Sequence, residues 1–220
     1  ANVREAARPL NVLLAEDSII NQKLAVGLLE RWGHHVTVAN DGREAVSWAT
    51  QQTFDVILMD IQMPELDGLD ATREIRQREA GTGKHTPIIA MTAHALQGDR
   101  ERCLAVGMDD YLTKPIRFEQ LFERLENIGQ QAPAAESLVT EVHPIAPPLV
   151  APVVDAGPGD VAGLVNWKKA LAATAGDREL LHDISRAFLE ECPTLVQHAF
   201  SEFTAGDWKS LQRTMHTLKN

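Results

Sequence analysis

Four short apolar segments in the first part of the sequence each run directly into polar or charged residues. They are Leu10–Ala15 before Glu16 and Asp17, Val56–Met59 before Asp60, Pro87–Met91 before Thr92, and Tyr111–Thr113 before Lys114. Short apolar runs separated by segments of helical spacing are typical of parallel strands buried on both faces of a sheet. Because parallel strands end at the same edge of the sheet, we expect these polar side chains to meet there.

The segments between these runs have the spacing of amphipathic helices. Ser18 can cap a helix that continues to about Trp32, and Asp41 can open a second helix. Further helices are expected at 66–79, 96–106 and 117–128, and further strands at 35–39 and 109–113. Strands that alternate with helices in this way predict an α/β domain with helices on both faces of a parallel sheet.

The residues at the expected edge suit one kind of chemistry. The carboxylates of Glu16, Asp17 and Asp60 are the hard oxygen donors that Mg²⁺ prefers. Thr92 can hydrogen-bond to phosphoryl oxygens, and Lys114 can neutralise their charge. Phosphoryl transfer depends mostly on such positioning and electrostatic stabilisation. Asp60 is therefore a candidate nucleophile that would carry an acyl phosphate.

Residues 10–129 resemble the receiver domain of two-component signalling. The residues that carry the resemblance are Leu13–Ser18, Leu58–Pro64 with Gly68, Met91–Ala93 and Tyr111–Pro115. The resemblance implies a flavodoxin-like, doubly wound sheet of five parallel strands in the order 2-1-3-4-5. It also implies that Asp60 accepts a phosphoryl group from a histidine kinase.

The same resemblance assigns roles to the other residues at this edge. The implied magnesium ligands are Glu16, Asp17, Asp60 and the backbone carbonyl of Gln62. Thr92 and Tyr111 would form a switch pair, in which the hydroxyl moves toward the phosphoryl group and the ring turns inward. Lys114 would bind the phosphoryl group, and the small side chain of Ala93 would leave space for it.

The composition changes sharply after Gly129. Residues 130–160 contain six prolines among alanines and valines. Proline interrupts backbone hydrogen bonding and helical continuity, so this stretch is interpreted as an extended, semi-rigid linker. Its valines and Ile145 leave open that part of it docks on a neighbouring surface.

From residue 161 the pattern is helical only. We expect helices at 167–173, 177–191, 193–203 and from 207 to the end. Asp177 and Asp207 are plausible N-caps, and Pro193 suits the first turn of a helix. Apolar residues at helical spacing between Leu180 and Phe188 predict packing in a helical bundle.

The string Met215–Lys219 resembles the phosphohistidine motif of histidine phosphotransfer domains. On a helix, His216 and Lys219 share a face, so the lysine could neutralise a phosphoryl group on the histidine. Neutral histidine is nucleophilic near physiological pH. In that family glycine usually follows the lysine, whereas here Asn220 follows. We interpret residues 161–220 as the N-terminal part of a histidine phosphotransfer domain, an incomplete all-α bundle.

These features together predict a phosphorelay module from the cytoplasmic part of a hybrid sensor histidine kinase. Its expected partners are a kinase core, expected in the same parent chain, a histidine phosphotransfer site and a downstream response regulator. One alternative is a free-standing receiver and phosphotransfer protein. Another is a haloacid-dehalogenase-like phosphatase, a family with a second aspartate two residues after the nucleophile, where this chain has Gln62. A purely structural binding module would leave the clustered acids and lysine unexplained.

Composition excludes several other classes. The net charge is −10, and the receiver-like region has no basic stripe that could follow a nucleic-acid backbone. No apolar run reaches the roughly 18 to 20 residues of a membrane-spanning helix, so we expect no membrane contact by this segment. Cys103 and Cys192 fit neither a disulfide framework nor a zinc motif, which favours a cytoplasmic location. An inner-membrane anchor elsewhere in the parent protein stays open.

Overall fold

The computed structural model describes residues 6–92, 97–114, 116–131, 167–174 and 176–219. Five parallel strands form one sheet in the order β2-β1-β3-β4-β5, which confirms the expected topology. They are β1 (Asn11–Ala15), β2 (His35–Ala39), β3 (Val56–Asp60), β4 (Ile88–Thr92) and β5 (Asp110–Thr113). Ala93 and, apart from residues 130 and 131, the expected linker at 130–160 lie outside the described residues.

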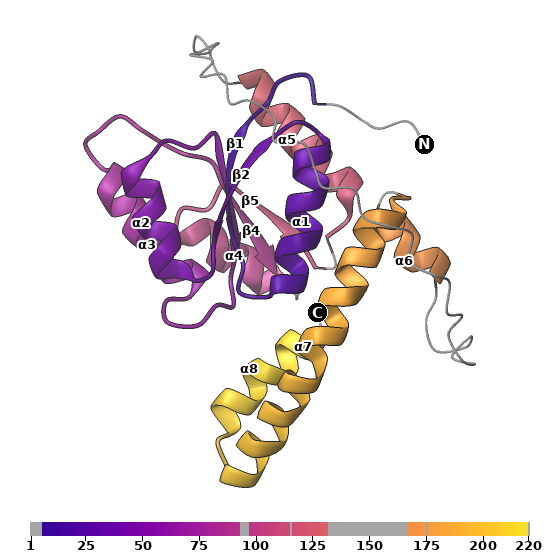
Figure 1. The fold of residues 1–220 in the computed structure, drawn as a ribbon. Coiled ribbons are helices and arrows are strands. Elements are labelled where there is room, and N and C mark those ends of the chain that lie inside the picture. The colour runs from indigo at the N-terminus through magenta and orange to yellow at the C-terminus, as the bar shows by residue number, and fades with distance from the viewer. Residues whose placement is uncertain (1–5, 93–96, 115, 132–166, 175, 220) are drawn as a thin grey trace.

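Helices cover both faces of the sheet. The first face carries α1 (Ile19–Arg31) and α5 (Phe118–Gln131). The second carries α2 (Gly42–Gln51), α3 (Gly68–Glu79) and α4 (Gln97–Ala105). Figure 1 shows α2 and α3 on one side of the strands and α1 on the other.

The central strands supply both hydrophobic cores by alternation. In β3, Ile57 and Met59 pack on the side of α2 and α3, whereas Val56 and Leu58 pack on the side of α1 and α5. Successive side chains of a strand point to opposite faces, so a strand covered on both sides must be apolar throughout. This burial explains why β3 reads as an unbroken apolar run up to Asp60.

Side-chain caps fix where the helices begin. Ser18 accepts a hydrogen bond from the Asn21 N–H, and Asp41 accepts one from the Glu44 N–H. Asp177 caps the first long helix after the linker in the same way. These bonds satisfy backbone donors that have no partner within the helix. Asp207 caps the last helix through the Ser210 N–H. The four N-caps expected from the sequence are thereby confirmed.

The C-terminal part consists of α6 (Trp167–Ala173), α7 (Arg178–Ala205) and α8 (Trp208–Lys219). The expected break before Pro193 is wrong, because α7 continues through this proline. A proline inside a helix removes one N–H donor and disturbs one turn, but the bonds on either side can still hold the helix together. Helix α7 ends at Gly206, whose φ of 72° allows α8 to turn back along α7 (Figure 1).

Among the described helices, none combines the length and apolar character that crossing a membrane requires.

Candidate functional site

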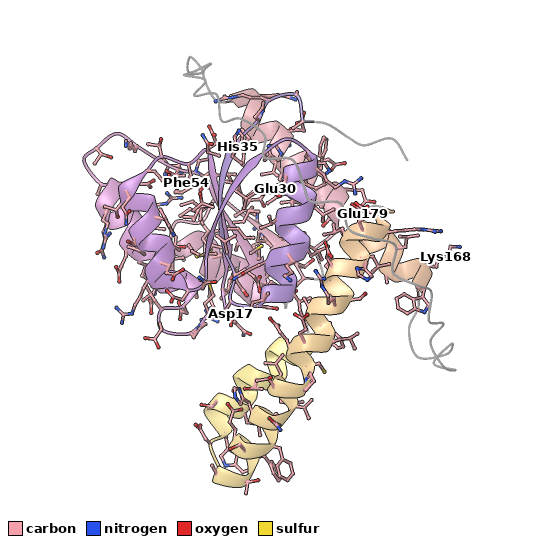
Figure 2. The ribbon with its side chains drawn as sticks, in the orientation of Figure 1. Asp17, Glu30, His35, Phe54, Lys168 and Glu179 are labelled. Atoms are coloured by element: carbon pink, nitrogen blue, oxygen red, sulfur yellow. The ribbon has the colours of Figure 1, made fainter. Side chains whose placement is uncertain are left out.

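The parallel register brings the polar residues of four strand ends together. Ala15 in β1 pairs with Met59 in β3, and Asp60 pairs with Met91 in β4. Thr92 at the end of β4 pairs with Thr113 in β5, directly before Lys114. Figure 2 shows Asp17 at this edge of the sheet, opposite the edge near His35. The sequence-predicted residues of the edge therefore belong to one site.

Three carboxylates converge at this edge. Ligand oxygens of Glu16, Asp17 and Asp60 all lie within 4.8 Å of one another. Glu16 and Asp60 are buried, whereas Asp17 is half-buried at the start of the loop to α1. Oxygen donors this close together, with one of them accessible, suit a single hard divalent cation.

Lys114 bridges two of these acids. Its Nζ lies 2.6 Å from Glu16 Oε2 and 2.6 Å from Asp60 Oδ2. The lysine side chain is only 6% exposed, so both ion pairs are shielded from water. The Lys114 backbone N–H donates to the Thr92 carbonyl at 2.7 Å, which fixes the lysine beside β4.

Burial and repulsion among the acids raise their pKa values. Burial, and then the charge of Glu16, raises the pKa of Asp17 to about 6. Burial, and then the charge of Asp60, raises the pKa of Glu16, and burial likewise raises the pKa of Asp60. Burial alone would lower the pKa of Lys114, but Asp60 and Glu16 outweigh it and raise that pKa.

The charges and donors of the site fit Mg²⁺. Three ionised carboxylates and one lysine leave a net charge of about −2, which a divalent cation would neutralise. The oxygen donors lie at the edge of the sheet, and the metal keeps several waters in such sites. Glu16, Asp17 and Asp60 would hold the ion. The Gln62 N–H donates to Asp60 Oδ1 at 3.1 Å, so Gln62 lies beside this carboxylate.

Two further residues support the site, and the sequence reasoning did not single them out. Asn21 Nδ2 donates to Glu16 Oε1 at 2.9 Å, and Gln22 Nε2 donates to the Glu16 carbonyl at 2.6 Å. Both lie in the first turn of α1, three and four positions after the Ser18 cap. The sequence signal that could have identified them is a pair of amide side chains directly after a helix N-cap that itself follows two acids. They hold Glu16 in place and join α1 to the acid cluster.

Gly68 allows a close approach of the backbone to Asp60. A Cβ atom placed on Gly68 would lie 2.0 Å from the Asp60 carbonyl oxygen. The Gly68 N–H also donates to the Ile61 carbonyl at 3.0 Å. A side chain at position 68 would push against backbone that cannot yield easily, so this glycine is required by close approach. It fixes the loop that follows Asp60.

Thr92 and Tyr111 lie on the same face of the sheet. Tyr111 pairs with Ala90, two residues before Thr92, and side chains alternate between faces along a strand. Thr92 is buried, whereas the Tyr111 ring is half-buried and packs against the core of the second face. The guanidinium of Arg100 in α4 lies 5.9 Å from the Tyr111 ring centroid. This placement is compatible with the expected switch pair.

His216 and Lys219 both lie within α8, on the backbone of one helix. Their side chains fall outside the part of the chain that the structure describes. Helical spacing alone therefore relates the two residues.

Residues 12–126 match the family model described as "Response regulator receiver domain". Among solved structures, the receiver domain of a sensor histidine kinase from Pseudomonas aeruginosa is 48% identical, with a TM-score of 0.51. The match covers 56% of this chain and 99% of that chain. That structure has a magnesium ion coordinated in its active-site cleft.

Two curated relatives extend the comparison. The hybrid signal transduction histidine kinase I of Dictyostelium discoideum is 50% identical over 120 residues, which are 52% of this chain. The signal transduction histidine-protein kinase BarA of Escherichia coli is 34% identical over 215 residues, which are 97% of this chain. The matches cover 7% and 22% of those proteins, so this chain spans a small part of either.

Proposed function

The chain belongs to the response regulator receiver domain family, and on this premise we propose that Asp60 accepts the transferred phosphoryl group. A carboxylate oxygen of Asp60 would attack phosphorus and form an acyl phosphate. The phosphorus–nitrogen bond to the donor histidine breaks, and its electron pair stays on the imidazole. The observation that most directly supports this proposal is the position of Asp60 between Lys114 and two further acids.

The other residues of the site would prepare this transfer. Mg²⁺, when bound by Glu16, Asp17 and Asp60, supplies positive charge against the phosphoryl oxygens. The Gln62 carbonyl is proposed as a further ligand. Lys114 would exchange its contact with Asp60 for one with the phosphoryl group. Thr92 would donate a hydrogen bond to the same group, and Tyr111 would respond by turning inward.

The test is to incubate the chain with acetyl phosphate and Mg²⁺ and to locate the added mass by peptide mapping. We expect one phosphoryl group on the peptide that contains Asp60, and none in Asp60→Asn. Asp67→Asn is the matched control, because asparagine can still cap α3 as Asp67 does. Absence of label from the Asp60 peptide of the parent, or label that persists in Asp60→Asn, would contradict the assignment.

The same experiment separates a receiver from an aspartate-based phosphatase. A phosphatase needs a second acid to activate water, and Gln62 stands at the position where such an acid is expected. We expect a stable acyl phosphate that accumulates to about one group per chain. Continuous release of phosphate without accumulation would favour the phosphatase.

We propose further that the chain is the cytoplasmic phosphorelay part of a hybrid sensor histidine kinase. The support is the alignment with BarA, which extends past the receiver through the helical segment. Its partners would be a histidine kinase core in the same parent protein and a downstream response regulator. His216 would receive the phosphoryl group from Asp60, with Lys219 as its neutralising neighbour.

The histidine assignment has its own chemical test. Phosphohistidine is labile in acid, whereas an acyl phosphate is labile in base. Starting from the Asp60-phosphorylated chain, we expect acid-labile label to appear in the parent and not in His216→Gln. His198→Gln is the matched control, since this histidine lies on an exposed helical surface of α7. Acid-labile label that survives in His216→Gln would rule this histidine out.

A further inference from the structure

Helix α7 of the C-terminal segment contacts α1 of the receiver along one side (Figure 1). The two helices are far apart in the sequence and run in roughly opposite directions. Arg31, at the end of α1, pairs with Asp177, at the start of α7. Burial raises the pKa of Glu191, further along α7, and the positive charge of Lys23, near the start of α1, opposes this rise.

The centre of this contact is a leucine that lies over a glycine. A Cβ atom placed on Gly27 would lie 2.5 Å from Cδ1 of Leu180 and 3.2 Å from its Cδ2. Leu180 therefore occupies space that any other residue at position 27 would fill. It also packs against the receiver core formed by α1, α5 and the sheet. The absence of a side chain at Gly27 makes the notch that receives Leu180.

Charge complementarity surrounds this apolar centre. The receiver side contributes the two cations Lys23 and Arg31, and α7 contributes the two anions Asp177 and Glu191. Asp177 is only 17% exposed, although a capping aspartate is usually open to solvent. Oε1 of Glu191 is buried and makes no hydrogen bond within the described structure. Both acids are thus partly withdrawn from water.

We propose that α1 is a docking surface for α7 of the same chain, with Gly27 as the notch and Leu180 as the inserted side chain. The consequence of this docking for phosphoryl transfer rests on the proposed function. Helix α8 packs along α7, and Phe203 meets Trp208 edge to face at 5.8 Å between ring centroids. Docking of α7 therefore determines where the helix with His216 lies relative to the receiver.

This surface is joined to the phosphoacceptor site through α1 itself. The first turn of α1 holds Glu16 through Asn21 and Gln22, and the middle and last turns hold α7. One rigid helix thus contacts the acid cluster and the docked segment. The docked segment is complementary to this face of the receiver in shape and in charge.

Hydrogen exchange on the whole chain tests the docking. Gly27→Leu fills the notch, and leucine favours helix over glycine, so α1 itself is not weakened. We expect amides of residues 178–191 to exchange about tenfold faster or more, while β1 and β3 stay protected. Asp177→Asn should act in the same direction but less strongly, since asparagine preserves the α7 cap.

Arg43→Glu is the matched control. Arg43 forms an exposed pair with Glu65 at 3.9 Å, away from α7, and its loss should leave α7 exchange unchanged. Unchanged exchange in both Gly27→Leu and Asp177→Asn would overturn the proposal. If dilution of the parent chain removed the protection of α7, the occupant would be a second copy, and the intrachain assignment would also fail.

Phosphoryl uptake in the same samples separates this inference from the proposed function. Gly27→Leu should still accept phosphoryl from acetyl phosphate at Asp60, and Asp60→Asn should keep α7 protected. If the parent chain took up no phosphoryl group, the proposed function would be refuted and the docking proposal would stand. Loss of protection in Asp60→Asn would show that the docking depends on the acid site rather than on the notch.

Discussion

The Nζ atom of Lys114 lies 2.6 Å from Oδ2 of Asp60, and both side chains are almost completely buried. The same ammonium group also contacts Glu16. A phosphoryl group on Asp60 would bring new negative oxygens into this space, and Lys114 would have to leave at least one partner to bind them. The site thus holds Lys114 in contact with the carboxylate that we propose to react.

Removal of this cation should destabilise the metal-free protein. Lys114→Ala leaves Glu16 and Asp60 buried without their cation, and breaking a buried pair costs about 3 to 5 kcal/mol unless the acids take up protons. We expect a lower melting temperature without metal and partial recovery in Mg²⁺. Lys84→Ala, at an exposed position, is the control. An equal loss with and without Mg²⁺ would show that the lysine acts only through packing.

Lys114→Ala should also disconnect phosphorylation from the expected switch. Tyr111 is the only tyrosine in the chain, so its ring resonances can be assigned without ambiguity. In the parent chain we expect these resonances to shift when Asp60 is phosphorylated. In Lys114→Ala the phosphorylated and free spectra should be similar around Tyr111. Identical shifts in parent and variant would remove Lys114 from the switch.

Asp17→Asn should weaken Mg²⁺ binding by about tenfold or more, because it removes one of the three proposed carboxylate ligands. The metal-free fold should be as stable as the parent or more so, since one repelling charge is gone. Calorimetric titration measures the affinity. Asp70→Asn, an exposed acid on α3, controls for loss of net charge. Equal affinity in parent and Asp17→Asn would exclude Asp17 as a ligand.

Mg²⁺ affinity should depend on pH through Asp17. Burial, then the Glu16 charge, raises the pKa of Asp17 from 3.8 to about 6, and the metal needs the ionised form. Below about pH 6 we expect affinity to fall, approaching tenfold per pH unit from this group alone. Titrations at about pH 7.5 and pH 5.5 measure the change. Asp17→Asn should show a weaker dependence over this interval.

The raised pKa of Asp17 also predicts how the stability of the fold changes with pH. A carboxyl whose pKa is raised on folding contributes stability that is complete below pH 3.8 and is lost as the pH rises through about 6. As the pH rises from 3.8 to about 6, the unfolding free energy of the metal-free parent should therefore decrease relative to that of metal-free Asp17→Asn. Urea denaturation at several pH values gives the difference. A change of opposite sign would mean that Asp17 is ionised at low pH in the folded state.

Gly68→Ala should be strongly destabilising. The new Cβ would meet the Asp60 carbonyl oxygen at 2.0 Å, and overpacking of this kind costs roughly 1 to 3 kcal/mol or more. Gly129→Ala in α5 is the matched control, because the new Cβ atom would contact only Leu10 Cδ2, at 3.8 Å. We expect the control to be neutral or slightly stabilising in chemical denaturation. Equal stability of the two variants would show that the loop after Asp60 can move aside.

Local patterns in the sequence were sufficient to predict the sheet and the edge at which Asp60, Glu16 and Asp17 meet. Strand alternation, helix caps and polar residues at strand ends are local patterns, and parallel topology then brings those ends together. The same local reasoning failed at Pro193. There the sequence favoured a new helix, whereas the bonds on both sides keep α7 continuous.

Local patterns could not show which side chains complete the site or which surface is covered, because both depend on packing between distant segments. The double contact of Lys114, the support of Glu16 by Asn21, and the insertion of Leu180 over Gly27 each depend on distances in space. In a sequence, Gly27 is one glycine inside a helix, and nothing nearby in the chain explains it. Close packing gives it a role, because a missing side chain matters only when a distant residue fills the space.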